Sequence, residues 1–424
     1  MKQQLLKKLR LLLSVAAVTL LIPLPMAAQT RIAVVSDIHV MDPRLLANDA
    51  ASNEPWITDF AGERKMLDKS AGLFTQLVKA LKSSKPDILL ITGDLTKDGE
   101  KASHDYVKAG LEELTASLHN IKVFVIPGNH DIASSTGTLY KYDGTTRTAL
   151  EQEEKITTVD AFATQYNGYG YGDANSAYDT NSKSYATEPV PGLVIIGIDS
   201  HSATISSETL TWVSEQATAA RDKGKQVIAM MHHPLFPHIT GADMFIDTYA
   251  LANYTDIRNA LITAGVKVIL TGHFHTSDIA YDWKDDESDG IYDINTGSLI
   301  SYPCDYRMLT LSQDKQTLNV TTLSLTPNGM TADQCKTWIE DRVKKVATTK
   351  LNASPYNSLG LTAEDKSFLI ETAASTFILH AEGDENTKDA ATTLLNRYNS
   401  HSFTTTGPLF TYPKSVVRLN FSHF

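Results

Sequence analysis

Two apolar runs of strand length, each ending abruptly at histidines, constrain this chain more than any other feature of its sequence. Val227–Met231 runs into His232-His233-Pro234, and Val268–Thr271 runs into Gly272-His273-Phe274-His275. A buried strand followed by a polar loop brings side chains to the carboxyl edge of a sheet, where α/β proteins place their chemistry. Imidazoles on successive strands therefore predict a metal site that also needs carboxylates.

Carboxylates arrive in the same way, at the ends of earlier apolar runs. The polar residues that follow such runs are Asp37, His39, Asp94, Asn129, His130, His232, His273 and His275. Leaving His130 aside, two carboxylates, an amide and four imidazoles suit two divalent metal ions that share one carboxylate. Oxygen and nitrogen donors without thiolate favour Mn, Fe or Zn. In Asp37-x-His39 and His273-x-His275, alternate residues of an extended segment would point to the same side.

Helical patterns alternate with the apolar runs. Apolar residues recur at spacings of three and four over 65–83 and 104–118, between strands predicted at 31–36, 87–92 and 122–126. This βαβαβ order predicts a parallel sheet with right-handed crossovers, and we expect all the strands that end in polar residues to belong to it. The same alternation predicts further strands at 193–198, 226–231 and 268–271, with helices at 210–223 and 257–264.

Two segments depart from this alternation. Residues 132–191 are rich in Thr, Tyr, Gly and Asn, and we interpret them as an insertion that covers the site, with a short helix at 159–165. After His275 the period changes, and four short runs joined by Asp/Gly and Asp-Lys turns predict an antiparallel region.

The two ends of the chain are expected to lie outside the catalytic unit. Residues 1–28 combine four cations, the apolar stretch Leu11–Leu24 and a small-residue cleavage site, which predicts a signal peptide. An uncleaved anchor is the alternative, but the stretch is short and contains prolines. We expect an exported protein, periplasmic or secreted, without a membrane span in the mature chain. Residues 30–325 would form the catalytic domain, and 328–424 a mostly helical domain of unknown role that includes helices at 331–346, 362–381 and 388–398 and a closing strand at 417–421.

Charge and cysteine content limit the partners and the compartment. The net charge is −11, and −15 once the four leader cations are removed (−11 − 4), which argues against a nucleic-acid groove. Cys304 and Cys335 are the only cysteines. An oxidising compartment would allow one disulfide between them, and two separate thiols are nearly as well supported. The sequence does not indicate an oligomeric state.

The ordered motifs resemble the signature of the calcineurin-like metallophosphoesterase superfamily over residues 30–323. The matching pieces are Asp37-x-His39, Gly93-Asp94, Gly128-Asn129-His130-Asp131, His232 and Gly272-His273-x-His275. The resemblance implies an α/β fold, a four-layer α/β/β/α sandwich of two mixed sheets. It also implies a first metal held by Asp37, His39, Asp94 and His275, and a second held by Asp94, Asn129, His232 and His273, with Asp94 bridging.

The resemblance further implies roles around the metals. His130 would contact the phosphate or protonate the leaving oxygen, and Asp131 would hold His130 by hydrogen bonding. His233 is the alternative to His232 as a ligand, and would otherwise face the substrate or support the ligands. Loop positions also considered for substrate contact are His201, Tyr306 and Arg307, with Tyr302 and His238; ordinary loop packing is the competing interpretation for each.

The motif details favour one branch of the superfamily. Lys97 stands where purple acid phosphatases carry a ligating tyrosine, whereas Gly93–Thr96 and His232–Pro234 are more similar to class III cyclic nucleotide phosphodiesterases and related exported phosphoesterases. We expect hydrolysis of a small phosphodiester, such as a cyclic nucleotide, by metal-bound hydroxide. The alternatives are a phosphomonoesterase or 5′-nucleotidase and a phospholipid headgroup phosphodiesterase. A metal-dependent binding module is disfavoured because every expected ligand is present.

Overall fold

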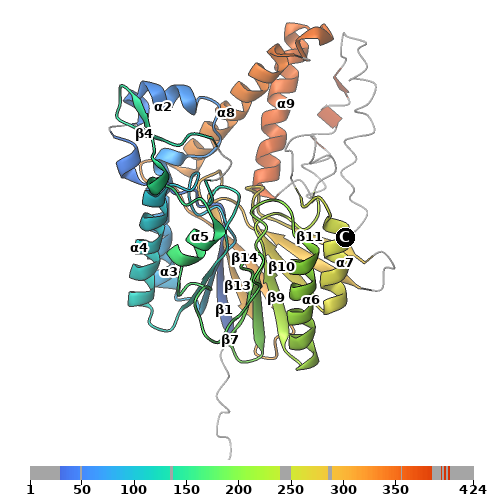
Figure 1. Cartoon of the computed structure of the whole chain (residues 1–424). Coiled ribbons are helices and arrows are strands. Elements are labelled where there is room, and N and C mark those ends of the chain that lie inside the picture. The colour runs from blue at the N-terminus through green and yellow to red at the C-terminus, as the bar shows by residue number, and fades with distance from the viewer. Residues whose placement is uncertain are drawn as a thin grey trace, which may run out of the picture.

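Two mixed β-sheets, flanked by helices on their outer faces, form the body of the molecule (Figure 1). The computed structural model describes residues 29–47, 50–133, 137–238, 250–284, 289–354 and 356–383, together with residues 393, 396, 397, 400 and 401. The strand orders are β14-β13-β1-β2-β3 and β11-β12-β10-β9-β8-β7-β6. This is the α/β/β/α sandwich that the motif resemblance implied.

The first sheet contains the βαβαβ unit predicted from the sequence. Its strands are β1 (Thr30–Val35), β2 (Ile88–Ile91), β3 (Lys122–Val125), β13 (Asp305–Leu311) and β14 (Leu318–Ser324), with crossover helices α3 (Ser70–Ser84) and α4 (Lys101–Ser117). β1, β2 and β3 are parallel, and β13 lies antiparallel to β1. Ile32–Val35 are fully buried, as expected for a strand covered on both faces of its sheet.

The second sheet carries the histidine-terminated strands. It consists of β6 (Ala177–Tyr178), β7 (Tyr185–Val190), β8 (Leu193–Gly197), β9 (Gln226–Met230), β10 (Val268–Thr271), β11 (Asp278–Trp283) and β12 (Gly290–Asn295), flanked by α6 (Ser207–Asp222) and α7 (Tyr254–Ala264). β8, β9, β10 and β12 are parallel, while β7 and β11 run antiparallel at the two sides.

The expectation of one sheet is wrong. The antiparallel pairing expected after His275 is confirmed for β11 with β12 and for β13 with β14, but the two pairs belong to different sheets. β12 joins the second sheet parallel to β10, whereas β13 and β14 return to the first sheet beside β1. An apolar run indicates that a strand is buried on both faces of its sheet, but it does not specify which neighbouring strand it pairs with. The two sheets meet near the site, where Ser36 forms a bridge with Ser298.

The segment 132–191 is not mainly a cover over the site. It contains the hairpin β4 (Tyr140–Tyr142) and β5 (Arg147–Ala149), the predicted helix α5 (Val159–Gln165), and then β6 and β7 of the second sheet. The tyrosines of its second half pack in the core, where the rings of Tyr171 and Tyr185 lie 5.2 Å apart. Composition suggested a loop because these aromatic residues alternate with glycines and polar turns.

Short helices complete the loops around the sheets. They are α2 (Glu54–Asp59) and the 3-10 helices η1 (Pro43–Leu45), η2 (Ala50–Ser52), η3 (Leu67–Lys69), η4 (Gln152–Glu154) and η6 (Tyr356–Leu359). α2 begins after Asn53, whose side chain accepts a hydrogen bond from the Trp56 N–H. The Trp56 ring then packs against Tyr142 at a centroid distance of 5.3 Å, which joins the 50–60 segment to the β4–β5 hairpin.

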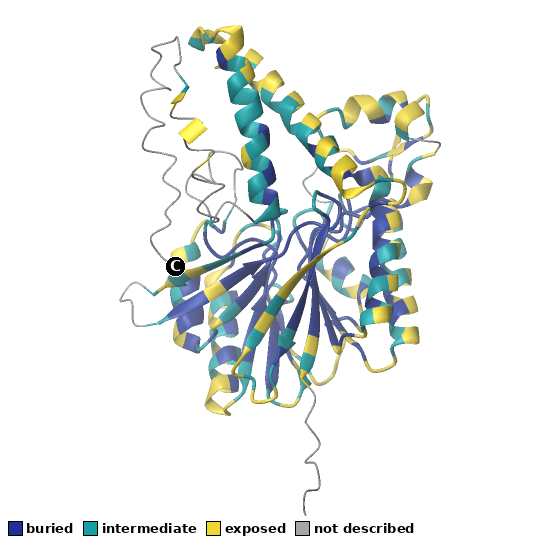
Figure 2. Ribbon diagram, turned by 180° about the vertical axis from the view of Figure 1, so that it is seen from behind, coloured by how far each residue is buried: buried dark blue, intermediate teal, exposed yellow. Residues whose placement is uncertain are grey.

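Two long helices, α8 (Ala332–Asn352) and α9 (Ala363–Glu382), rise from the end of the sheets that carries the site (Figure 2). Both begin at the predicted threonine caps. Cys304 and Cys335 are both buried with free thiols, and burial, together with the nearby Cys335, raises the pKa of Cys304. No helix in the described part of the chain is long and apolar enough to cross a bilayer. The predicted signal peptide, the strand at 417–421 and most of the helix at 388–398 lie outside the described residues.

Candidate metal centre

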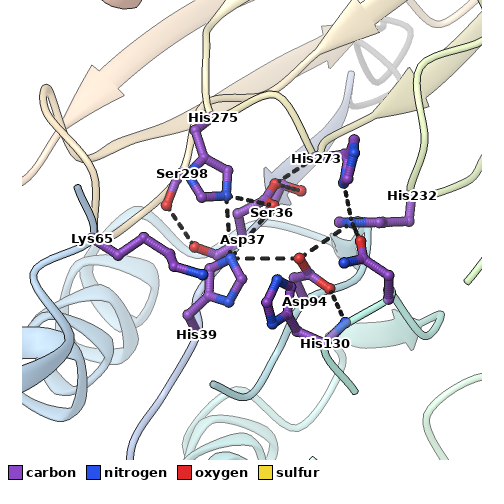
Figure 3. A network of polar contacts seen from close by, with 12 residues as sticks. Ser36, Asp37, His39, Lys65, Asp94, His130, His232, His273, His275 and Ser298 are labelled. Carbon is purple, nitrogen blue, oxygen red and sulfur yellow. Dashed lines mark hydrogen bonds and ion pairs between the residues drawn. The ribbon is translucent and has the colours of Figure 1, made fainter. Parts of the chain in front are cut away.

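Side chains from both sheets converge where β1, β2, β9 and β10 end (Figure 3). Three overlapping groups each bring possible ligand atoms within 4.8 Å of one another. The groups are Asp37, His39 and His275; His39, Asp94 and His130; and Asp94, His232 and His273. The structure therefore brings together residues predicted from five separate motifs.

One oxygen of Asp94 lies between the two halves of this cluster. Asp94 Oδ2 is 3.4 Å from His39 Nε2 and 3.3 Å from His232 Nε2. Asp94 Oδ1 accepts a hydrogen bond from the His130 backbone N–H at 2.8 Å, which fixes the carboxylate plane. A carboxylate held in this way can serve ligand sets on both sides.

The first half joins the end of β1 to the loop after β10. His275 Nε2 lies 3.2 Å from His39 Nε2 and 3.2 Å from Asp37 Oδ1. Asp37 Oδ1 is buried without a hydrogen-bond partner. Buried carboxylate oxygens rarely remain unpaired, and a divalent cation between these three atoms would satisfy all of them.

The second half is built around His232. His232 Nε2 lies 3.0 Å from Asn129 Oδ1 and 3.3 Å from His273 Nδ1. His232 Nδ1 is 2.9 Å from the carbonyl of Thr92, to which it can donate. That hydrogen bond turns Nε2 toward the cluster, as in protein metal sites where a backbone carbonyl orients the ligating imidazole. The donors in both halves fit divalent cations.

Backbone conformation separates these residues from most of the chain. Asp37, His39, Asp94, His273 and His275 have φ of 49°, 41°, 52°, 69° and 61°. Left-handed conformations cost non-glycine residues roughly 1–3 kcal/mol each, and they concentrate at functional sites. The expectation that Asp37-x-His39 and His273-x-His275 are extended is wrong, because both are tight turns that aim their side chains through positive φ.

Two motif glycines make room for the carboxylates. A Cβ on Gly128 would lie 2.2 Å from Asp94 Oδ1, and one on Gly272 would lie 1.8 Å from Ser36 Oγ and 2.6 Å from Asp37 Oδ2. Asp37 Oδ2 accepts hydrogen bonds from Ser36 Oγ and the His273 N–H. Glycine is therefore needed at both positions for the carboxylates to keep their observed places.

Charge in the cluster is arranged around Asp94. Burial alone would raise the pKa of Asp94, but His232, His130 and His39 hold it well below its usual value. Burial opposes a charge on His232, yet Asp94 raises the pKa of His232 to about 9. Burial lowers the pKa of His39 and of His273, which favours the neutral form that a ligand requires. Without a metal, a proton on His232 supplies positive charge beside Asp94.

His130 differs from the other histidines of the cluster. Its Nδ1 lies 2.7 Å from Asp98 Oδ1, a carboxylate outside the three ligand groups. Its side chain is 26% exposed, close to the 23% of His275, whereas those of His39 and His232 are 0% exposed. Burial would raise the pKa of Asp98, but hydrogen bonds from His130 and Lys97 lower it to about 2. Asp98 is thus an ionised partner that orients His130 and leaves Nε2 open.

The predicted role of Asp131 as the partner of His130 is wrong. The Asp131 carboxylate accepts backbone N–H groups of Leu95, Thr96 and Gly128 at 2.9–3.1 Å, and no contact joins it to the His130 ring. Burial and the nearby Asp94 raise the pKa of Asp131 to about 7. Asp131 ties together the two loops that carry Asp94 and Asn129. Sequence reasoning missed Asp98, whose only signal is its place in the polar loop after Gly93-Asp94.

His233, Tyr306 and Arg307 are buried at 1%, 5% and 3% exposure, which does not support substrate contact. The His233 ring packs against His273 at 4.3 Å, and burial lowers its pKa to about 3. Arg307 donates to the carbonyls of Asp278 and Asn295. These contacts give His233 and Arg307 structural roles behind the cluster.

The remaining loop candidates fall into two groups. His201 is part-exposed, with Nδ1 2.7 Å from Asp199 Oδ1, and it stays a candidate for substrate contact. His238 lies between the carboxylates of Asp278 and Asp293, and Tyr302 donates to Glu382 on α9. The last two therefore hold elements together.

A cluster of imidazoles and carboxylates at the edge shared by two sheets defines a divalent-metal centre. The sequence model of the calcineurin-like phosphoesterase family matches residues 30–277, more than half of the chain. The chain belongs to this family and is a metal-dependent hydrolase of phosphoric esters. Helices α8 and α9 lie beyond the matched residues.

Several relatives have phosphodiesterase names. The chain is 25% identical over 247 residues to a probable cyclic nucleotide phosphodiesterase of Fibrobacter succinogenes, covering 58% of this chain and 73% of the relative. It is 26% identical over 245 residues to a cAMP/cGMP dual specificity phosphodiesterase of Mycobacterium tuberculosis. That match covers 57% of this chain and 61% of the relative. A solved dimetal phosphatase from Danio rerio is 13% identical, with a TM-score of 0.42 over 70% of this chain and 99% of that structure.

Proposed function

We propose that this chain is an exported phosphodiesterase that works with two divalent metal ions, Mn, Fe or Zn. The observation that carries the proposal is the position of Asp94 Oδ2, within 3.4 Å of nitrogen ligands from both halves of the cluster. A single cation would leave one half unsatisfied. The names of the relatives support a diester substrate, with a cyclic nucleotide as the first choice.

The residues of the chain have distinct parts in this reaction. Two divalent ions would bind phosphate oxygens, lower the pKa of a water and stabilise charge during an in-line displacement. Asp94 would hold both halves of the centre in register. His130, with Nδ1 on Asp98, would present Nε2 to the leaving oxygen and donate its proton as a general acid.

A glycerophosphodiester is the second candidate substrate. A probable glycerophosphodiester phosphodiesterase of Arcobacter nitrofigilis is 28% identical over 155 residues, covering 35% of this chain and 42% of that protein.

The proposal of export rests on residues 1–28 and has its own test. When the protein is purified from the cell envelope or the medium, its N-terminal sequence should begin near residue 29. Recovery of the intact N-terminus from the cytosol would contradict export.

A metal-supplemented hydrolysis panel tests the main proposal. It sets bis-p-nitrophenyl phosphate against p-nitrophenyl phosphate, then cyclic nucleotides, nucleoside monophosphates and a glycerophosphodiester. We expect diesters to be preferred, Asp94→Ala and His232→Ala to lose metal and activity, and His130→Ala to keep metal but lose rate. The matched control is His119→Ala, an exposed histidine. Activity on monoesters alone, or full activity of Asp94→Ala, would overturn the proposal.

A further inference from the structure

A pocket beside the metal centre has no part in the chemistry above. It has a volume of about 360 Å³ and lies between the 50–68 segment and helix α8. Ile57 and Phe60 line one side, and Trp338 and Arg342 on α8 line the other. The volume is at the lower end of the usual range for small-molecule sites, about 300–1,000 Å³.

Two chains of contacts connect this pocket to the metal centre. Lys65 lines the pocket, and Figure 3 shows its side chain running toward His39 in the first half of the cluster. On another side, Lys97 Nζ lies 5.2 Å from the centre of the Phe60 ring, and Lys97 pairs with Asp98, which holds His130. The pocket therefore adjoins both the metal ligands and the general acid.

The walls of the pocket suit a flat ring. Trp56 and Phe60 pack at a centroid distance of 4.2 Å, and the guanidinium of Arg342 lies 5.1 Å from the centre of the Trp338 ring. Arg342 Nη1 also donates to the carbonyls of Phe60 and Ala61, at 3.2 and 2.8 Å. These two hydrogen bonds fix the spacing between α8 and the 50–68 segment, so the pocket is already formed without a ligand.

The charge of the pocket limits which ring or headgroup it accepts. Its lining includes the cations Lys65, Arg342 and Lys345 and the carboxylates Glu63 and Asp68, a balance of 3 − 2 = +1. Aromatic walls can bind quaternary ammonium groups, but a lining with net positive charge repels a cation. A choline headgroup is thus disfavoured, whereas a neutral heteroaromatic ring attached to a phosphate suits both the aromatic walls and the cations.

We propose that the pocket between α2 and α8 binds the nucleobase of a nucleotide diester whose phosphate lies at the metal centre. The inference rests on the proposed function and adds the part of the chain that would bind the base. It assigns α8, which lies outside the family match, the role of a specificity wall: Trp338 and Arg342 would select the base without touching the reacting atoms.

Two variants test the pocket, each with a matched control. Ile57→Glu places a charge at a side chain that is 47% exposed, so the fold should be retained; Leu323→Glu makes the same change on the exposed strand β14. Trp338→Ala removes a wall, and Trp283→Ala removes an exposed indole on β11. For 3′,5′-cyclic AMP we expect each pocket variant to raise KM roughly tenfold, in line with base stacking, without a matching loss of kcat. For glycerophosphoethanolamine, which has no base, KM should stay near that of the wild type, as it should for both substrates in the controls.

A binding measurement separates this proposal from the proposed function. Calorimetric titration of the unmodified protein with AMP measures the affinity of the pocket in the absence of hydrolysis. The pocket variants should weaken AMP binding roughly tenfold. If diesters are hydrolysed but the variants change neither KM for cyclic AMP nor AMP affinity, the pocket proposal is wrong and the function stands. If glycerophosphocholine shows the dependence on Trp338 instead, the base assignment is wrong. If AMP binding depends on the pocket while no diester is hydrolysed, the proposed function is wrong and the pocket assignment stands.

Discussion

At the scale of single residues, the partner of each imidazole decides what that imidazole can do. His232 and His130 both lie within the cluster around Asp94, yet their Nδ1 atoms have different partners. The carbonyl of Thr92 holds Nδ1 of His232 and leaves Nε2 facing the ligand cluster, whereas the carboxylate of Asp98 holds Nδ1 of His130 on a part-exposed ring. The same side chain thus serves as ligand in one place and as acid in the other.

The motifs alone could predict which residues gather, but not which carboxylate serves which histidine. Asp131 follows His130 directly in the sequence and was the natural partner to expect. In the structure, Asp131 turns inward to three backbone N–H groups, and Asp98 reaches His130 from the preceding loop. Hydrogen bonds to backbone depend on loop geometry, which residue spacing does not encode.

Replacing Asp98 tests its role as the residue that positions His130. In Asp98→Asn we expect kcat to fall roughly tenfold to a hundredfold, with metal content unchanged. The reason is that His130 loses the ionised carboxylate that orients its ring. The loss should be larger for a cyclic nucleotide than for bis-p-nitrophenyl phosphate, whose leaving group needs little proton donation. Rates and metal content per chain would be measured together.

The matched control for this change is Asp105→Asn, a half-exposed carboxylate on α4. It should keep the rate on both substrates. Equal losses on the two substrates, or loss of metal in proportion to activity, would show that Asp98 is only structural.

At the scale of elements, the bounds of the buried strands could be predicted well, but which strands lie next to each other in a sheet could not. β1, β2, β3, β8, β9 and β10 all appear within a residue or two of the apolar runs that predicted them, because buried parallel strands have a clear pattern. β6 and β7 were missed because they are short, aromatic and interrupted by turns. The division into two sheets depends on long-range pairing that no local pattern specifies.

His238 joins elements across the second sheet and predicts a pH-dependent stability. It follows β9, and its two ring nitrogens lie 3.0 Å from Asp278 on β11 and 3.2 Å from Asp293 on β12. Burial opposes its charge, but Asp293 and Asp278 raise its pKa to about 10, above the ordinary value of 6.5. The stabilisation is therefore full below pH 6.5 and is lost as the pH rises through 10.

The variant His238→Gln should cost on the order of a few kcal/mol at pH 6.5, because two buried carboxylates lose their partner. That cost should shrink markedly by pH 9.5. Urea unfolding at the two pH values measures the difference, with the exposed His119→Gln as a control that changes stability at neither pH. A cost for His238→Gln that is the same at both pH values would contradict a charged His238.

At the scale of the whole molecule, the metal centre joins the two sheets. Asp37 and Asp94 follow strands of the first sheet, whereas His232, His273 and His275 follow strands of the second. Positive φ occurs at Asp37, His39, Asp94, His273 and His275, and Asp37 Oδ1 is buried without a hydrogen-bond partner. The fold therefore carries local strain and a buried carboxylate oxygen without a hydrogen bond, which bound cations would offset across the interface between the sheets.

Metal binding should consequently stabilise the fold as a whole, and not only the loops that carry the ligands. At a metal concentration a hundredfold above Kd, each site adds about 2.7 kcal/mol to the free energy of unfolding. We expect chelator-treated protein to gain several degrees in Tm when Mn²⁺ or Zn²⁺ is restored. Asp37→Ala on the first sheet and His273→Ala on the second should each reduce that gain, and Asp94→Ala should reduce it most because it serves both halves. Asp314→Ala, in an exposed turn, should keep the full gain. Identical melting curves for chelated and metal-loaded wild-type protein would refute a cation bridge between the sheets.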